Sequence, residues 1–114
     1  MAKNLDFVIL LDIYGNMLTD RQRDVMELYY WEDLSLGEIA ESNNITRQAV
    51  RDSIKRGEVT LEEFEKKLGL AEKIIKCREC FNSIASYAES MKNNGTDKAD
   101  EIIRIAGKGK EIFW

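Results

Sequence analysis

The sequence of 114 residues contains no histidine, no proline and only two cysteines. Without histidine, the chain lacks the commonest general base and the commonest zinc ligand. Two cysteines cannot form a disulfide framework, so a reducing, cytoplasmic location is expected. The absence of proline permits long uninterrupted helices. We therefore predict a protein that is not an enzyme, with no catalytic residue, no bound metal, no cofactor and no small-molecule substrate.

Long apolar runs are also missing. The run from Phe7 to Leu11 is five residues long and ends at Asp12, which is far too short to span a membrane. No signal peptide is recognisable before it. We expect no association with a membrane.

The residues that are present predict an all-α protein. Hydrophobic residues make up 44% of the chain and charged residues 33%, which is typical of a globular protein. Apolar residues recur at helical spacing, and the alternating Val, Ile and Thr tracts of strands are absent. The length predicts a single domain over residues 1–114.

Positive charge is concentrated in one short segment. The chain has a net charge of −4, which argues against a nucleic-acid partner. Residues 46–56, however, contain four cations against the single anion Asp52, a net charge of +3. This segment is the first indication of an anionic ligand.

Local signals predict the helix starts of the N-terminal half. Asn4 can cap a helix that extends to about Tyr14. Thr19 with Gln22 forms a capping box that opens a helix through about Trp31, and Ser35 with Glu38 forms a second box before a short helix. The aromatic residues Tyr29, Tyr30 and Trp31 could stack on bases, but their spacing favours the protein core.

The C-terminal half contains two apolar seams. The first predicts one helix from about 46 to 68, with Gly57 as a weak point; the alternative is a break at Gly57. Gly69 ends this helix, and a second seam follows at Ile74, Cys77, Phe81, Ile84, Ala88 and Met91. Two such seams joined by a glycine predict an antiparallel helical hairpin, over about residues 57–92.

The remaining residues, 96–114, are predicted to form a short last helix and a tail. Thr96 or Asp97 can cap the helix, which extends through Ala106, and residues 107–110 form a loose tail. Cys77 and Cys80 have the spacing of half a metal site or a redox pair, but no further ligands accompany them. We interpret Cys77 as a buried helix cysteine.

The strongest pattern is that of a helix-turn-helix core, over about residues 18–56. Two helices that cross through a tight turn need a small residue at their contact, which Ala40 provides, and an apolar residue in the turn, which is Ile45. Val50 and Ile54 then form the buried stripe of the second helix. Its opposite face is what a recognition helix presents to the major groove, since Arg can read guanine, Gln can read adenine, and the remaining cations contact phosphate. The predicted DNA contacts are Thr46, Arg47, Gln48, Arg51, Lys55 and Arg56.

The same residues carry a resemblance to known proteins. Leu18-Thr19, Gln22-Arg23, Glu38-Ile39-Ala40 and Val50 with Ile54 resemble the signature of region 4 of bacterial sigma factors, over about residues 18–56. The wider chain, over about residues 5–91, resembles the YlxM family of small sigma region 4-like helix-turn-helix proteins. The resemblance implies a DNA-binding transcription regulator and, through the neighbourhood of the family's genes, a role in the signal recognition particle pathway. Asp52 and Ser53 depart from the polar or basic residues that sigma factors often have there.

Two functions follow from these patterns. The first is a DNA-binding regulator. The alternative is an adaptor that does not bind DNA and instead binds protein or RNA–protein components of the signal recognition particle system. In either role we expect a homodimer, because the first helix is apolar on more sides than one small domain can cover. The dimer would be held by that helix, by the hairpin of residues 46–91, or by both.

Overall fold

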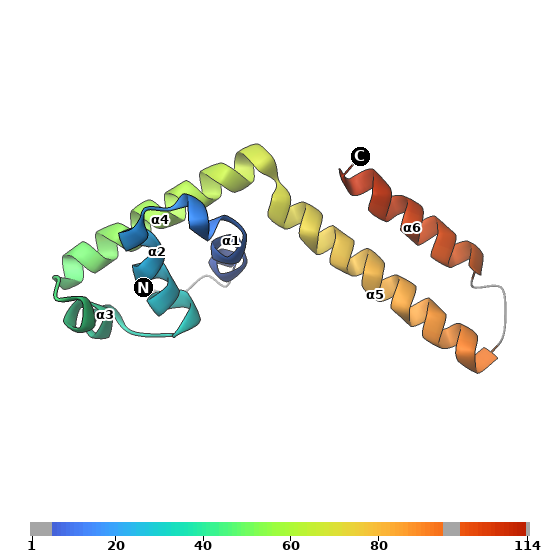
Figure 1. Cartoon of the computed structure of the whole chain (residues 1–114), viewed down its shortest axis with the longest axis horizontal. Coiled ribbons are helices and arrows are strands. Elements are labelled where there is room, and N and C mark those ends of the chain that lie inside the picture. The colour runs from blue at the N-terminus through green and yellow to red at the C-terminus, as the bar shows by residue number, and fades with distance from the viewer. Residues whose placement is uncertain (1–5, 95–98, 114) are drawn as a thin grey trace. The chain divides into compact units, whose positions relative to one another are not determined.

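The computed structural model describes residues 6–94 and 99–113 (Figure 1). Over these residues the chain is helical and contains no strand, which confirms the all-α prediction. The helices are α1 (Asp6–Tyr14), α2 (Asp20–Met26), α3 (Leu36–Asn43), α4 (Arg47–Leu68), α5 (Leu70–Asn94) and α6 (Ala99–Phe113). None of the described helices is both long enough and apolar enough to cross a membrane.

The chain divides into two compact units, residues 1–69 and residues 70–114. The single domain over residues 1–114 stays a prediction. We call the two units the helix-turn-helix unit, which contains α1 to α4, and the hairpin unit, which contains α5 and α6. Gly69 ends α4 as predicted, because its φ of +63° lies in the left-handed region that glycine adopts without strain.

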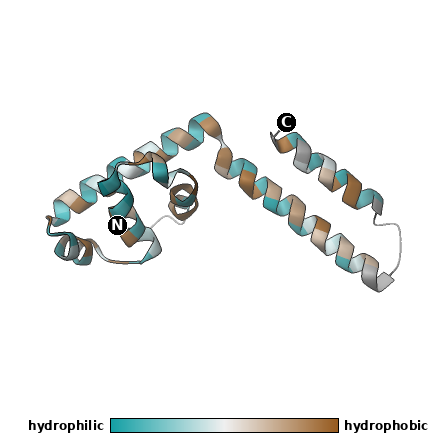
Figure 2. Ribbon diagram, in the orientation of Figure 1, coloured by the Kyte–Doolittle hydropathy of each residue, from teal (hydrophilic) through white to brown (hydrophobic). Residues whose placement is uncertain are grey.

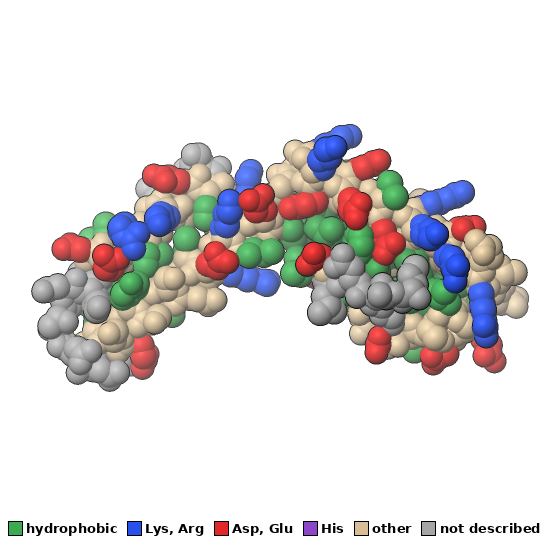
Figure 3. Space-filling view, turned by 180° about the vertical axis from the view of Figure 1, so that it is seen from behind, with side chains coloured by type: hydrophobic (Ala, Val, Ile, Leu, Met, Phe, Trp, Pro, Cys, Tyr) green, Lys and Arg blue, Asp and Glu red, His purple; other side chains and the backbone are tan. Residues whose placement is uncertain are grey.

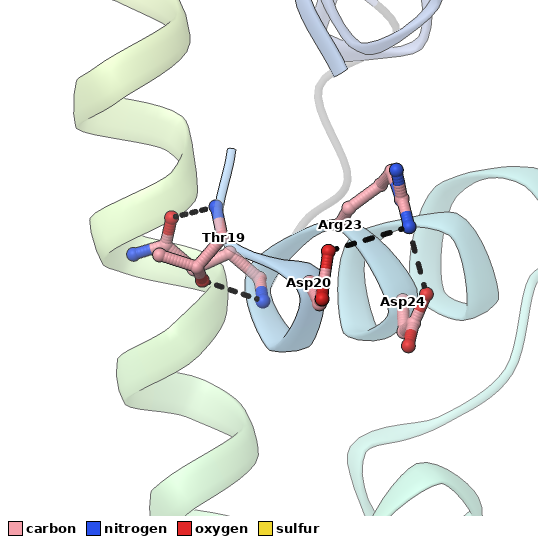
Figure 4. Close-up of polar contacts among 5 residues, drawn as sticks. Thr19, Asp20, Arg23 and Asp24 are labelled. Atoms are coloured by element: carbon pink, nitrogen blue, oxygen red, sulfur yellow. Dashed lines mark hydrogen bonds and ion pairs between the residues drawn. The ribbon is translucent and has the colours of Figure 1, made fainter. Parts of the chain in front are cut away.

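Both predicted capping boxes are present. The Thr19 hydroxyl oxygen accepts a hydrogen bond from the Gln22 backbone N–H at 3.2 Å, and the Gln22 side chain accepts one from the Thr19 backbone N–H (Figure 4). Ser35 and Glu38 make the same reciprocal pair, with both distances at 3.1 Å. The predicted cap at Asn4 lies outside the described residues.

The helix that begins at Asp20 does not continue regularly to Trp31. It changes into a π-helical turn over Glu27–Trp31, in which the Glu32 N–H donates to the Glu27 carbonyl oxygen at 3.1 Å. The wider turn shifts the phase of the helix, so that Tyr29 and Tyr30 are both buried while Trp31 is 47% exposed. The prediction that Trp31 belongs to the core is therefore wrong.

Helix α4 is the central element of the helix-turn-helix unit. It continues through Gly57 without a break, as predicted, and it packs against α1, α2 and α3. Gly57 lies directly against α2, because a Cβ atom built there would be 2.1 Å from the Met26 sulfur. Glycine at this position permits the close approach of the two helices.

The core of this unit is apolar and is bordered by two tyrosine–glutamate contacts. The hydroxyl of Tyr14 donates to a carboxylate oxygen of Glu65 at 2.7 Å, and that of Tyr30 donates to Glu58. Each contact connects α4 to an earlier segment of the chain. Figure 2 marks the hydrophobic residues along each helix in brown. The fully buried side chains are Leu11, Val25, Met26, Ile39, Val50, Ile54 and Leu61.

The hairpin unit contains features that the sequence did not indicate. Within this unit the antiparallel pair consists of α5 and α6 (Figure 1), a pair that the sequence did not predict. The predicted pairing of the helix of residues 46–68 with the helix after Gly69 stays a prediction. Helix α6 extends through Gly107 and Gly109, so the prediction of a loose tail at residues 107–110 is wrong. A Cβ atom built at Gly109 would lie 4.0 Å from the Cys80 Cβ, which places these two positions at the contact between the helices. Thr96 and Asp97 lie outside the described residues.

The predicted seam of α5 is only partly covered by α6. Ile74, Cys77, Ile84 and Met91 are half-buried, but Phe81 is 68% exposed and Ala88 is exposed as well. Cys77 and Cys80 carry free thiols and are both half-buried, so Cys77 is less enclosed than predicted.

Candidate nucleic-acid interface

Helices α3 and α4 are connected by a tight turn that is held by hydrogen bonds to the end of α3. Asn44 adopts a left-handed conformation with φ of 55°, and the Ile45 N–H donates to the Ala40 carbonyl oxygen at 3.0 Å. The side chains of Ser42 and Asn43 both donate to the Ile39 carbonyl oxygen. Ala40 is buried and Ile45 is half-buried, in agreement with their predicted places at the corner.

Thr46 caps α4 as the sequence predicts. Its hydroxyl oxygen accepts from the Ala49 N–H at 3.0 Å, and its carbonyl oxygen accepts from the Val50 N–H at 3.1 Å. These bonds fix the direction in which α4 leaves the turn. The side chains of the first two turns of α4 are thereby directed by a rigid corner.

The first half of α4 has one buried face and one charged face. Val50 and Ile54 are fully buried against the unit. Lys and Arg side chains are arranged along the first half of the helix in Figure 3. The structure leaves all the predicted DNA contacts exposed, and these are Thr46, Arg47, Gln48, Arg51, Lys55 and Arg56.

Arg23 of α2 makes ion pairs, in contrast to the four cations in the first half of α4, which are Arg47, Arg51, Lys55 and Arg56. The Arg23 guanidinium lies 3.6 Å from an Asp20 oxygen and 3.9 Å from an Asp24 oxygen (Figure 4). Within the described part of the chain, the four cations of the α4 face make no ion pair. Their charge is therefore available to an external anion, whereas that of Arg23 is compensated.

Two contacts restrict the side chains of this face. The Gln48 side-chain amide donates to Asp52 at 3.0 Å, so Asp52 holds a candidate base-reading group in place. The Arg47 guanidinium lies over Gly37 of α3, since a Cβ atom built at Gly37 would be 2.9 Å from its Nη2 atom. Gly37 makes room for Arg47, and no spacing rule in the sequence indicates such a contact.

Comparison with known proteins supports the helix-turn-helix geometry. Residues 1–102 match the model of a family described as "Putative helix-turn-helix protein, YlxM / p13 like". The chain belongs to the YlxM / p13-like family.

Several relatives in this family are similar over most of their length. A UPF0122 protein of Desulforamulus reducens is 46% identical over 100 residues, which cover 84% of this chain and 86% of the relative. UPF0122 protein YlxM of Bacillus subtilis is 47% identical over 83 residues, covering 73% of this chain and 76% of the relative. UPF0122 protein BH2485 of Halalkalibacterium halodurans is 49% identical over 91 residues, with 80% and 84% covered. These matches confirm the resemblance derived from the motif residues.

Proposed function

We propose that the protein is a DNA-binding regulator that places the first half of α4 in the major groove. The observation that carries the proposal is the row of exposed cations Arg47, Arg51 and Lys55 along the first half of α4, with Arg56 beside it, none of which makes an ion pair among the described residues. Arg47 and Arg51 have the chemistry to read guanine, and Gln48 that to read adenine. Lys55 and Arg56, one turn or more further along, contact phosphate in this arrangement.

We also propose that the regulator acts as a homodimer. A single recognition helix with four cations binds DNA weakly on a chain with a net charge of −4. Two recognition helices about 34 Å apart would enter successive major grooves and double the number of released counterions. Homodimerisation thus supplies the affinity that one unit lacks.

The alternative is an adaptor for components of the signal recognition particle system, a partner that the family resemblance implies. Its support in the structure lies outside the α4 face. Trp31 is 47% exposed, which is typical of a residue in a protein contact. Residues 1–69 carry nine cations and fourteen anions, a net charge of −5, which repels nucleic acid away from the cationic row.

The salt dependence of binding separates these two functions. After selection of bound sequences from random DNA, the affinity for the selected duplex is measured by fluorescence anisotropy at several salt concentrations. A dimer that contacts about four phosphates per subunit should give a slope near −7 for log affinity against log salt, at about 0.9 per phosphate. Failure to enrich any DNA, together with co-purification of signal recognition particle components at high salt, would favour the adaptor.

A further inference from the structure

The hairpin unit has very little core of its own. Among its described residues, the only buried hydrophobic side chains are Ala71 and Ile105. Two helices in contact along one face leave the remaining faces open, and a segment of about 40 residues rarely forms a stable core alone. Figure 3 accordingly shows hydrophobic side chains of this unit at the surface between charged ones.

One side of α5 carries apolar residues at a spacing of seven. Phe81, at 68% exposure, has the half-buried Ile74 seven residues before it and the exposed Ala88 seven residues after it, so the three lie on one side of the helix. Ala85 lies between Phe81 and Ala88 on the same side and is also exposed, and the exposed Arg78 lies between Ile74 and Phe81. We call the four apolar residues, Ile74, Phe81, Ala85 and Ala88, the α5 strip.

The α5 strip is complementary to itself when a second copy is turned end for end. Phe81 lies one residue from the middle of Leu70–Asn94. A two-fold axis near Phe81 therefore brings two Phe81 rings together and sets Ile74 against the second copy's Ala88. A large side chain then faces a small one on both sides of the axis, which is the packing that helix interfaces require.

Charge permits the same antiparallel arrangement. Residues 70–80 carry three cations and two anions, a net charge of +1, and they face residues 82–92 of the second copy, which carry Glu89 and Lys92. An antiparallel pair thus sets a segment of charge +1 against a neutral one, without repulsion. Over residues 70–114 the chain has eight cations and seven anions, so two hairpin units do not repel each other as two units of net charge −5 would.

The available area reaches the lower end of what a stable dimer needs. Helix α5 has 25 residues and α6 has 15, so they are about 37 Å and about 22 Å long at about 1.5 Å per residue. With helices of about 10 Å diameter, one face of the hairpin offers on the order of 600 Å². Stable interfaces take about 600–1,000 Å² from each partner.

We propose that the α5 strip binds the α5 strip of a second copy in antiparallel orientation, so that two hairpin units form a four-helix bundle. The inference names the interface of the homodimer and rests on that part of the proposed function. It does not require DNA binding.

Light scattering on the full chain without DNA tests the interface. At micromolar concentration the wild type should have twice the chain mass of 13.2 kDa. Phe81→Glu should halve the mass, because two buried carboxylates would meet at the axis, while the helix content measured by circular dichroism is retained. Ile75→Glu adds the same charge to an exposed apolar residue on another face of α5 and should leave the dimer intact. A monomeric wild type, or equal masses for the two variants, would overturn the proposal.

A disulfide test checks the position of the axis. In a background of Cys77→Ser and Cys80→Ser, Phe81→Cys should form a covalent dimer on mild oxidation, and Asn82→Cys on the neighbouring face should not. Preferential cross-linking through position 82 would contradict the antiparallel register. Arg47→Ala/Arg51→Ala should remain dimeric, so a failure of DNA binding is distinguishable from a failure of this interface.

Discussion

Helices α4 and α5 are similar in length but are used in opposite ways. Helix α4 has 22 residues, packs against three other helices and buries Val50, Ile54, Gly57 and Leu61. Helix α5 has 25 residues and α6 as its neighbour in the hairpin unit, and Ala71 is the buried hydrophobic residue among its described positions. An apolar seam thus indicates which side of a helix tends to be buried. The number of helices that pack against it determines how much of that side is buried.

The two units also differ in charge. The helix-turn-helix unit has a net charge of −5 but exposes a row of unpaired cations along α4. The hairpin unit has eight cations and seven anions, interspersed along its helices. An uneven distribution suits recognition of a polyanion, and a balanced one suits contact between identical surfaces.

The largest expected effect comes from truncation of the core of the helix-turn-helix unit. Ile54→Ala should lower the free energy of unfolding by about 2–5 kcal/mol, because Ile54 is fully buried and its removal leaves a cavity. Ile103→Ala makes the same chemical change at a position of α6 that is 68% exposed, and it should cost less than about 0.5 kcal/mol. Urea unfolding followed by circular dichroism measures both values. Similar losses in the two variants would contradict the difference between the units.

Glycine substitutions should have opposite signs in the two units. Gly57→Ala should lower stability by up to about 2 kcal/mol, since overpacking against the buried Met26 exceeds the gain in helix propensity. Gly107→Ala should raise stability by about 0.5–1 kcal/mol, because no atom lies within 4 Å of the added Cβ. The free energy of unfolding of each variant, measured relative to that of the wild type, tests both signs. A stabilising Gly57→Ala would show that α2 and α4 are not in close contact there.

The contact between Tyr30 and Glu58 should give a smaller, pH-dependent effect. Burial of Tyr30, together with the adjacent Glu58 carboxylate, raises the pKa of the Tyr30 hydroxyl. The hydroxyl therefore stays protonated in the folded chain at pH values at which it ionises in the unfolded chain. The stability that this hydroxyl contributes to the folded chain is fully present below a pH of about 10, the ordinary tyrosine pKa. The contribution decreases as the pH rises above that value.

Tyr30→Phe tests this contact, with the unfolding of the wild type at the same pH values as the reference. At pH 8 we expect Tyr30→Phe to lower the free energy of unfolding by about 1 kcal/mol, through loss of one hydrogen bond. The deficit should decrease above pH 10. A deficit that is constant to higher pH would mean that the Tyr30 hydroxyl is not held in its protonated form.

Local signals in the sequence were sufficient for most of the helix-turn-helix unit. The capping boxes at Thr19 and Ser35, the cap at Thr46 and the end at Gly69 involve only neighbouring residues, so they could be predicted correctly. The exposure of Trp31 could not be predicted, because the π-helical turn changes the helical phase and no residue type or spacing indicates such a turn.

Contacts between distant residues were harder to predict. The apolar period of a helix gives the face it buries but not its partner, so the pairing of α5 with α6 does not follow from the seams. The two glycines of α6 indicate a loose tail, whereas the helix continues through both. In the candidate interface, residue types and spacing were enough to predict an exposed cationic face. The position of Arg47 over Gly37 depends on how α3 and α4 cross, which spacing does not specify.

Binding of DNA by the cationic row of α4 is tested by a comparison of two charge-matched variants. Arg47→Ala/Arg51→Ala removes two charges from the row, and Lys66→Ala/Lys67→Ala removes two exposed charges from the last turn of the same helix. Fluorescence anisotropy with the selected duplex at fixed salt measures both affinities. The arginine variant should lose at least about tenfold in affinity, since each base-reading Arg contributes about 1–3 kcal/mol, and the lysine variant should bind almost as the wild type does. Equal losses in the two variants, or unchanged binding by the arginine variant, would contradict the account.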